Sequence, residues 1–203
     1  MNLIFLPGAS GNTDFWHPVM EMLPSDHRKT VIAYPSFGGY SDHVHVQSFQ
    51  DLQQYVIDQI QQSTIIIAQS MGGIFAVQAA LQKPKRVEAL VLVGTSGGID
   101  LSPFNVADWR NDYQITFDVP DWFIGHQVYL DDQLYKIDCP VLLIWGDSDP
   151  ISPVVVGQYL NGKIICSELH VIECSQHDLA FTHADQVSQI IQQFLDKIED
   201  VEL

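Results

Sequence analysis

Six short, almost continuously apolar runs recur along the chain, and they are rich in β-branched residues. Runs of this length that end in glycine, proline or small polar residues are typical of strands buried on both faces of a sheet. They cover residues 3–6, 30–34, 64–68, 89–93, 141–145 and 169–172. The pattern therefore predicts six buried strands.

Between these runs, the apolar positions return every three to four residues, which is the periodicity of an amphipathic helix. The clearest helical segments are 46–61, 71–82, 154–160 and 185–198. Strands that alternate with helices predict a parallel sheet with right-handed crossovers, so helices should cover both of its faces. Ligands bind such sheets at the carboxyl ends of the strands, and the loops there should hold the functional residues.

One long stretch, residues 98–138, breaks this alternation because it shows neither a strand nor a helix period. We interpret it as a small cap inserted into a single domain that spans residues 1–203. Its aromatic residues Trp109, Trp122 and Phe123, together with Ser10 in the first strand-end loop, are candidate pocket residues. The aromatic residues of this stretch could equally form a small core of its own.

Composition narrows the class of protein. The chain has 203 residues, 46% hydrophobic and 17% charged, which suits one globular domain and excludes a disordered or collagen-like chain. Its formal net charge of −16, from 9 basic and 25 acidic residues, would repel nucleic acid and anionic membrane surfaces. No apolar run approaches the roughly 20 residues that cross a bilayer. We therefore expect a protein that binds neither nucleic acid nor membranes.

The N-terminal residues and the cysteines predict a cytoplasmic protein without cofactors. The first residues, MNLIFL, lead directly into Pro7 and contain neither the basic region nor the long apolar region of a secretory signal. Cys139, Cys166 and Cys174 are odd in number and lack the spacing of metal ligands. We expect them to be thiols in a reducing compartment, and we expect neither a bound metal nor another cofactor.

The strongest chemical signal is the segment AQSMG, residues 68–72, where a predicted strand passes into a predicted helix. It is close to G-x-S-x-G, in which a serine sits on a strained turn and small flanking residues let strand and helix backbones pass closely. Ala68 stands where the pattern has its first glycine. A serine before a helix can also serve only as its N-cap, so the segment alone leaves both interpretations of Ser70 open.

Two further strand-end loops carry the partners that a serine nucleophile requires. Serine is a weak nucleophile, and it needs a base that is itself oriented by a third, usually acidic, group. Asp149 follows the fifth predicted strand and His177 follows the sixth. The carboxyl ends of these strands share one edge of the sheet, so Ser70, His177 and Asp149 form a candidate catalytic triad.

With these motifs the chain resembles the α/β-hydrolase fold family over nearly its whole length. The matching pieces are LPGA at 6–9, QSMGG at 69–73, LIWGDSDPI at 143–151 and His177 before the last helix. Members usually begin with an antiparallel hairpin, and the chain resembles a minimal version that starts at the family's third strand. The resemblance implies an α/β fold with about six mainly parallel strands, helices on both faces and a small cap.

Alternatives exist for two members of the triad. In the family pattern the acid lies three residues after the strand-end glycine, which selects Asp149, whereas Asp147 would cap the turn. His177 competes with His170, which lies inside an apolar strand, and with His183, which lies at a helix entry. We favour Asp149 and His177.

The expected activity is hydrolysis of an ester or related acyl bond through an acyl-Ser70 intermediate, with a rate that rises with pH as His177 loses its proton. The resemblance implies an oxyanion hole formed by the backbone N–H groups of Met71 and Ala9. The partner should be a small, partly apolar, uncharged or weakly cationic ester or acyl compound. The alternatives are C–C hydrolysis or a lyase step on the same triad, and a ligand-binding module with low turnover. The sequence leaves the oligomeric state open.

Overall fold

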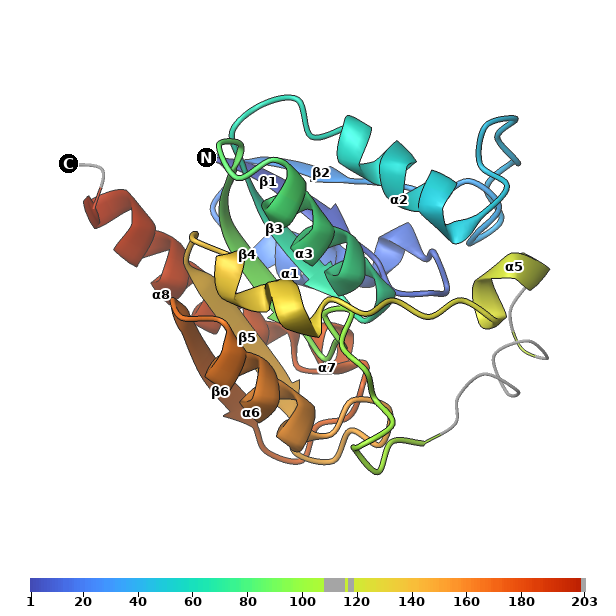
Figure 1. Cartoon of the computed structure of the whole chain (residues 1–203). Helices are drawn as coiled ribbons and strands as arrows, with labels where there is room; N and C mark the ends of the chain where they lie inside the picture. Colours follow the sequence, from blue (N-terminus) through green and yellow to red (C-terminus); the bar gives the residue numbers. More distant parts are fainter. Residues whose placement is uncertain (108–115, 117–118, 202–203) are drawn as a thin grey trace.

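A computed structural model of the chain describes residues 1–107, 116 and 119–201, in which six strands form one parallel sheet (Figure 1). The strands are β1 (Asn2–Leu6), β2 (Arg28–Val31), β3 (Thr64–Gln69), β4 (Val87–Val93), β5 (Val141–Gly146) and β6 (Ser167–Ile172). Their spatial order is β2-β1-β3-β4-β5-β6. β2 lies on one side of β1 and β3 lies on the other, so the direction in which successive strands are added reverses at β1. The gap between the loops after β1 and β3 is therefore the switch point where parallel sheets bind ligands.

Helices cover both faces of this sheet, as predicted. They are η1 (Thr13–Trp16), α1 (His17–Met22), α2 (Phe49–Asp58), α3 (Met71–Gln82), α5 (Asp121–Ile124), η2 (Asp131–Lys136), α6 (Val154–Lys163), α7 (Leu179–Thr182) and α8 (Ala184–Val201). One buried cluster joins α2, α3 and α6 to one face, and a second joins α1 and α8 to the other. No helix among the described residues is both long enough and apolar enough to pass through a membrane.

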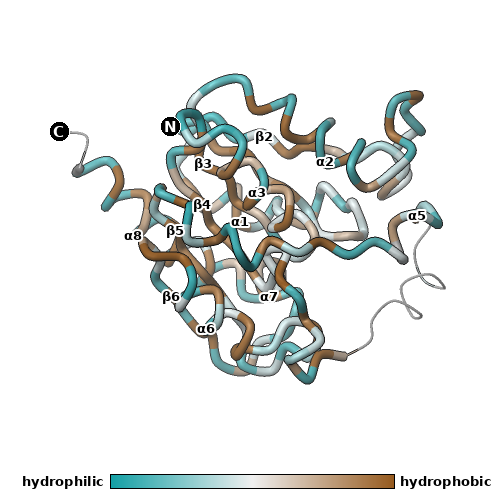
Figure 2. The backbone as a smooth tube through the Cα atoms, in the orientation of Figure 1, coloured by the Kyte–Doolittle hydropathy of each residue, from teal (hydrophilic) through white to brown (hydrophobic). Residues whose placement is uncertain are grey.

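The two cores follow from the strand period of two. In β1, Ile4 and Leu6 lie in the cluster under α2 and α3, whereas Leu3 and Phe5 lie in the cluster under α1 and α8. All six residues of β3 and of β5 are buried. Apolar residues on both faces of the central strands explain the continuous runs in the sequence. The helix α8 is also amphipathic, and Figure 2 shows hydrophobic residues followed by hydrophilic ones repeatedly along it.

The edge strands differ from the prediction. β2 covers Arg28–Val31 rather than 30–34, and its Arg28 and Thr30 are exposed. β6 is only partly buried over most of its length. An edge strand has a neighbour on one side only and lies at the margin of the helical layers, so the prediction of burial on both faces is wrong for these two strands.

The helices differ mainly at their ends. The segment predicted as 46–61 becomes helical at Phe49, because the Ser48 side chain caps the helix by accepting a hydrogen bond from the Asp51 N–H (3.1 Å). The predicted helix 71–82 has those bounds. The short helices α1 and α7 were not predicted, since elements of six and four residues carry too little periodicity to detect.

The stretch predicted as a cap, residues 98–138, holds α5 and η2 among its described residues, and Trp109 lies outside the described part of the chain. Its last part packs into the main core: Leu130, Leu134 and Ile137 are buried in the cluster that includes α3 and α6. The Leu130 N–H also donates to the Gly98 carbonyl oxygen (2.8 Å), which brings the first residue of the stretch beside a residue near its end. The stretch is thus anchored to the body of the protein at both ends.

Candidate active site

Ser70 sits at the sharp turn between β3 and α3. Its backbone angles are φ 53° and ψ −120°, a strained conformation for a residue other than glycine. The Ser70 carbonyl oxygen accepts hydrogen bonds from the Thr95 hydroxyl (2.5 Å) and the Gly73 N–H (3.0 Å), which hold the turn. The Ser70 side chain makes no capping hydrogen bond to α3. The interpretation of Ser70 as a simple N-cap is therefore wrong, and its hydroxyl is available for chemistry.

The turn depends on the absence of a side chain at Gly72. A methyl group at this position would lie 2.7 Å from the carbonyl oxygens of Leu6 and Pro7, so α3 crosses directly over the end of β1. These are backbone atoms that cannot move away without shifting the strand. The close approach is what brings the β1 loop, with Ala9, beside Ser70.

We expect Gly72→Ala to lower the free energy of unfolding by about 1–3 kcal/mol, because the added methyl overpacks the crossing. Gly162→Ala is the matched control, since Gly162 lies in α6 and a methyl there would meet nothing within 4 Å. Removing a helical glycine should raise stability by up to about 1 kcal/mol. Chemical denaturation of both variants checks the pair. Equal stabilities would show that the crossing is not tight.

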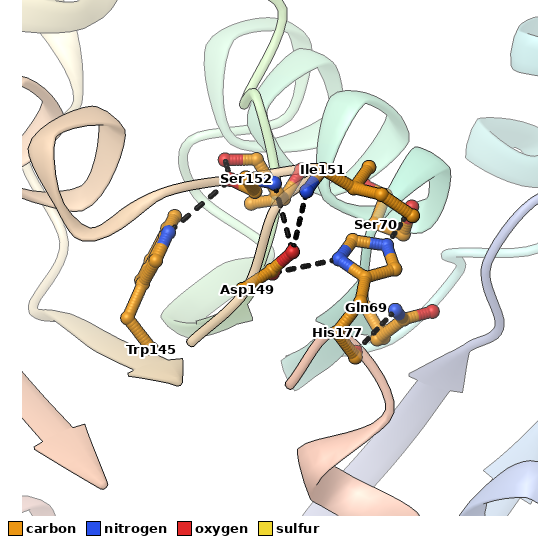
Figure 3. Close-up of polar contacts among 8 residues, drawn as sticks. Gln69, Ser70, Trp145, Asp149, Ile151, Ser152 and His177 are labelled. Atoms are coloured by element: carbon orange, nitrogen blue, oxygen red, sulfur yellow. Dashed lines mark hydrogen bonds and ion pairs between the residues drawn. The ribbon is translucent and has the colours of Figure 1, made fainter. Parts of the chain in front are cut away.

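His177 lies between the serine and an aspartate from a different loop (Figure 3). Its Nε2 is 3.0 Å from the Ser70 Oγ, and its Nδ1 is 2.8 Å from the Asp149 Oδ2. The other carboxylate oxygen, Oδ1, accepts the backbone N–H groups of Ile151 (2.8 Å) and Ser152 (2.9 Å). The Asp149 side chain has no exposed surface, so its remaining acceptor capacity is directed at the imidazole.

The other candidates lie elsewhere. Asp147 is exposed and accepts a hydrogen bond from the Ser148 hydroxyl, which lowers the pKa of the Asp147 carboxyl. His170 faces Glu168 on β6 (3.7 Å), and His183 contacts the Thr182 hydroxyl (3.0 Å) at the end of α7. Of the alternatives, the structure joins only Asp149 and His177 to Ser70.

A second layer of hydrogen bonds holds the triad loops together. The indole Nε1 of Trp145 donates to the Ser152 hydroxyl (3.2 Å), which donates to the Thr95 carbonyl oxygen (3.3 Å). The buried Gln69 side chain donates through Nε2 to the His177 carbonyl oxygen (3.2 Å). These residues tie β3, β4, β5 and the histidine loop to one another (Figure 3). Sequence reasoning missed them because no local motif marks a contact between distant loops.

A cavity of about 450 Å³ opens in front of Ser70 and His177. This volume lies within the roughly 300–1,000 Å³ of small-molecule sites. Ala9, Met71 and Phe123 line the cavity, and so do apolar side chains that follow β4, including Ile99 and Phe104. The wall is mixed, because serine, histidine, glutamine, tyrosine and aspartate side chains lie among the apolar ones.

Two predicted pocket residues are not among those that line this cavity. Trp122 lines a separate, more open hollow and packs against the buried Phe37, whereas its neighbour Phe123 also touches Phe37 but faces the triad cavity. Adjacent residues of a helix point in different directions, so α5 presents only one of them to the site. The Ser10 hydroxyl instead accepts the Asn12 N–H (3.3 Å) in its own turn. The described lining of the triad cavity thus includes neither Trp122 nor Ser10, and their predicted role in binding a substrate stays a prediction.

Among the residues that the structure describes, no three histidine, cysteine, aspartate or glutamate side chains are grouped as metal ligands would be. Cys139, Cys166 and Cys174 are free, and the two exposed ones lie outside the lining of the cavity. Burial raises the pKa of the Cys139 thiol to about 11, which makes this residue an unreactive packing group. The described polar side chains that line the cavity carry hydroxyl, imidazole, carboxylate and amide groups.

Residues 2–129 match the sequence profile of the alpha/beta hydrolase fold. The chain is also 25% identical, over 240 aligned positions, to the 2-hydroxy-6-oxononadienedioate/2-hydroxy-6-oxononatrienedioate hydrolase of Escherichia coli (strain K12). That alignment covers 93% of this chain and 83% of the enzyme. The similarity extends across the three loops that carry Ser70, Asp149 and His177.

Solved structures agree at the level of the fold. A thermophilic esterase from Thermogutta terrifontis matches with a TM-score of 0.78 at 18% identity, over 98% of this chain and 90% of the esterase. A meta-cleavage product hydrolase from Pseudomonas fluorescens matches with a TM-score of 0.80 at 16% identity, over 97% and 91% of the two chains. One backbone architecture is thus common to proteins with different named activities.

Proposed function

Because the chain belongs to the α/β-hydrolase fold family, we propose that it is a serine hydrolase that cleaves an ester or related acyl bond. The observation that carries the proposal is the continuous hydrogen-bonded path from the Ser70 hydroxyl through His177 to the buried carboxylate of Asp149. Such a path is how proteins convert a weakly nucleophilic serine into a reactive one.

In the proposed reaction, His177 takes the Ser70 hydroxyl proton through Nε2 as the oxygen attacks the substrate carbonyl carbon. The imidazolium gains its stabilisation from Asp149, whose carboxylate faces the opposite ring nitrogen. The tetrahedral intermediate collapses to an acyl-Ser70 ester, and the leaving alcohol receives the proton from His177. Water, activated by the same imidazole, then attacks the acyl-enzyme and releases the acid.

The negative charge that develops on the carbonyl oxygen needs two donors. We assign these donors to the N–H groups of Ala9 and Met71, which flank Ser70 from two loops and both line the cavity. Met71 is the first residue of α3, so its N–H has no acceptor in the preceding turn. The Ala9 N–H takes part in none of the backbone hydrogen bonds among the described residues.

The substrate we propose is small, partly apolar and uncharged or weakly cationic. The cavity wall combines apolar side chains with neutral polar ones, and its described acidic member is Asp100, whose pKa is lowered by hydrogen bonds from Ser102. No lysine or arginine is among the described residues that line the cavity. An anionic substrate would therefore approach the ionised Asp100 without a described cation to offset the repulsion.

We also propose that residues 98–138 act as a cap within a single domain. The described residues that support this are Ile99, Leu101, Phe104, Val106 and Phe123, which all lie in this stretch and all line the triad cavity. Shielding by these side chains would keep bulk water away from the acyl-enzyme and limit the size of the acyl group.

Hydrolysis of a carbon–carbon bond beside a ketone, or a lyase step on the same triad, is the alternative reaction. It is favoured by the relatives, which include a hydrolase of 2-hydroxy-6-oxononadienedioate and a meta-cleavage product hydrolase. A dioate carries two carboxylates, which the cavity beside Asp100 would disfavour. For this reason ester hydrolysis is the first proposal.

Turnover of 4-nitrophenyl esters from acetate to decanoate tests the proposal, with labelling by a fluorophosphonate probe as a second readout. We expect hydrolysis with an optimum at a short or medium acyl chain, and labelling that the best ester slows by competition. Labelling without turnover of any ester would favour the carbon–carbon hydrolase, which a 2-hydroxy-6-oxo-dienoate substrate would then test. Absence of both labelling and turnover would favour a ligand-binding module.

A further inference from the structure

The triad cavity contains a second histidine that the proposed mechanism does not use. His126 follows α5 and lines the same cavity as Ser70 and His177. Its ring stacks on Phe49 of α2, with the ring centroids 4.2 Å apart and the ring planes at 18°. Neither residue belongs to a sequence motif, so the pair arises only where α2 and the chain after α5 meet.

The ring nitrogens of His126 make no hydrogen bond or ion pair with another described residue. Partial burial alone lowers the pKa of His126, with no contribution from a hydrogen bond or a nearby charge. In its neutral form, which burial favours, the imidazole offers one N–H donor and one nitrogen acceptor to whatever enters the cavity.

The stack on Phe49 restricts how these two groups can point. A ring held flat against another ring keeps its plane, so its nitrogens lie at the edges of the stack rather than turning toward the Phe49 face. Phe49 is buried and also contacts Phe75 and Phe123, which keeps it in place. His126 is therefore a positioned polar group beside the apolar rings of Phe49 and Phe123, and such groups are how small-molecule sites orient their ligands.

We propose that His126 binds an oxygen of the substrate outside the scissile ester, so that the preferred substrate carries an ether, hydroxyl or carbonyl group in its acyl or alcohol part. This inference rests on the proposed function and adds a substrate class to it. The scissile carbonyl is already served by the N–H groups of Ala9 and Met71, so it needs no further donor. An apolar substrate of the same length would leave the His126 donor without a partner, and the site would select against it.

Matched esters that differ by one oxygen test this assignment. In the acyl series, 4-nitrophenyl pentanoate, hexanoate and heptanoate are compared with the 3-methoxypropanoate, 4-methoxybutanoate and 5-methoxypentanoate of equal chain length. In the alcohol series, pentyl and hexyl butanoate are compared with 3-methoxypropyl and 4-methoxybutyl butanoate. The readout is the ratio of kcat/KM for each oxygen-containing ester to that of its alkyl counterpart, corrected for spontaneous hydrolysis.

For the wild type we expect the ratio to reach about tenfold at one oxygen position in one of the series, the size of one additional hydrogen bond. His126→Phe keeps a ring that can stack on Phe49 but removes both nitrogens, and it should bring that ratio to about one, mainly through KM. His126→Gln retains a donor and an acceptor and should restore part of the preference. His43→Phe is the control, because the His43 ring contacts the Tyr55 ring at a tilt of 55° and lies outside this cavity.

A wild type without any oxygen preference, or a preference unchanged in His126→Phe, would overturn the inference. If no ester is hydrolysed, the proposed function fails separately, and binding decides the role of His126. In that case the dissociation constants of 4-methoxybutanamide and hexanamide are compared by the NMR signals of the His126 ring. Tighter binding of the ether, lost in His126→Phe, would support the inference, and equal binding would overturn it.

Discussion

Replacing Ser70 by alanine should lower kcat for the best ester by about 10⁶, because the variant lacks the oxygen that forms the acyl-enzyme. The Ser70 side chain makes no capping hydrogen bond. The Thr95 hydroxyl and the Gly73 N–H donate to the Ser70 backbone carbonyl oxygen, which the substitution keeps. The variant should therefore fold normally and keep its thermal unfolding midpoint within a few degrees. Steady-state kinetics and calorimetry on the same preparation separate the two effects.

The control for this experiment is Ser63→Ala, which removes an exposed hydroxyl outside the cavity and should leave activity within about twofold. Fluorophosphonate should label the wild type and Ser63→Ala, and it should fail to label Ser70→Ala. Residual activity above about one per cent in Ser70→Ala would mean that another group attacks the substrate. The assignment of the nucleophile would then be wrong, whatever the geometry of the hydrogen bonds.

Asp149→Asn should lower kcat by about 10⁴ with little change in stability. The amide oxygen can still accept the N–H groups of Ile151 and Ser152, so the loop keeps its anchors. The amide nitrogen takes the place of Oδ2 and donates to the His177 Nδ1, which forces the ring proton onto Nε2. In that tautomer Nε2 faces Ser70 with a proton of its own and cannot accept the serine proton.

Asp147→Asn is the matched control, since Asp147 lies in the same loop but is exposed, and its carboxylate accepts hydrogen bonds from the Ser148 hydroxyl and from the backbone of Cys174 and Ser175 instead of from His177. It should retain activity within about twofold. Comparison of kcat for the two variants therefore decides between the two aspartates that the sequence left open. A large loss in Asp147→Asn with a small loss in Asp149→Asn would reject Asp149 as the acid.

The second layer of hydrogen bonds explains why the triad can be stable before substrate binds. Asp149 is fully buried beside a histidine, an arrangement that is costly unless each acceptor site is used. Two backbone N–H groups use one carboxylate oxygen, and Ser152 is in turn held by Trp145 and Thr95. The geometry of the site is thus a property of four loops that support one another.

The sequence by itself determined the class of the fold and indicated the three residues of the candidate triad. Continuous apolar runs predict strands buried on both faces, and this prediction holds for all residues of the inner strands β3 and β5 but not for the edge strands β2 and β6. The sharp turn at Ser70 could be predicted from the sequence because a strained turn needs small neighbouring residues, and Gly72 is one of them. Asp149 and His177 could be proposed from the sequence because each follows a predicted strand. The family pattern also gives the order serine, acid, histidine along the chain.

Only the tertiary structure decided which side chains share the cavity. Trp122 and Phe123 are adjacent in sequence and both contact Phe37, yet of the two only Phe123 is among the described residues that line the triad cavity. His126 and Phe49 are far apart in sequence and carry no motif, yet their rings stack in the wall of the site. Periodicity records whether a residue is buried in its own element, whereas the neighbours of a side chain depend on how separate elements pack. The candidate triad residues can therefore be predicted from sequence motifs. The residues that select the substrate depend on contacts that exist only after folding.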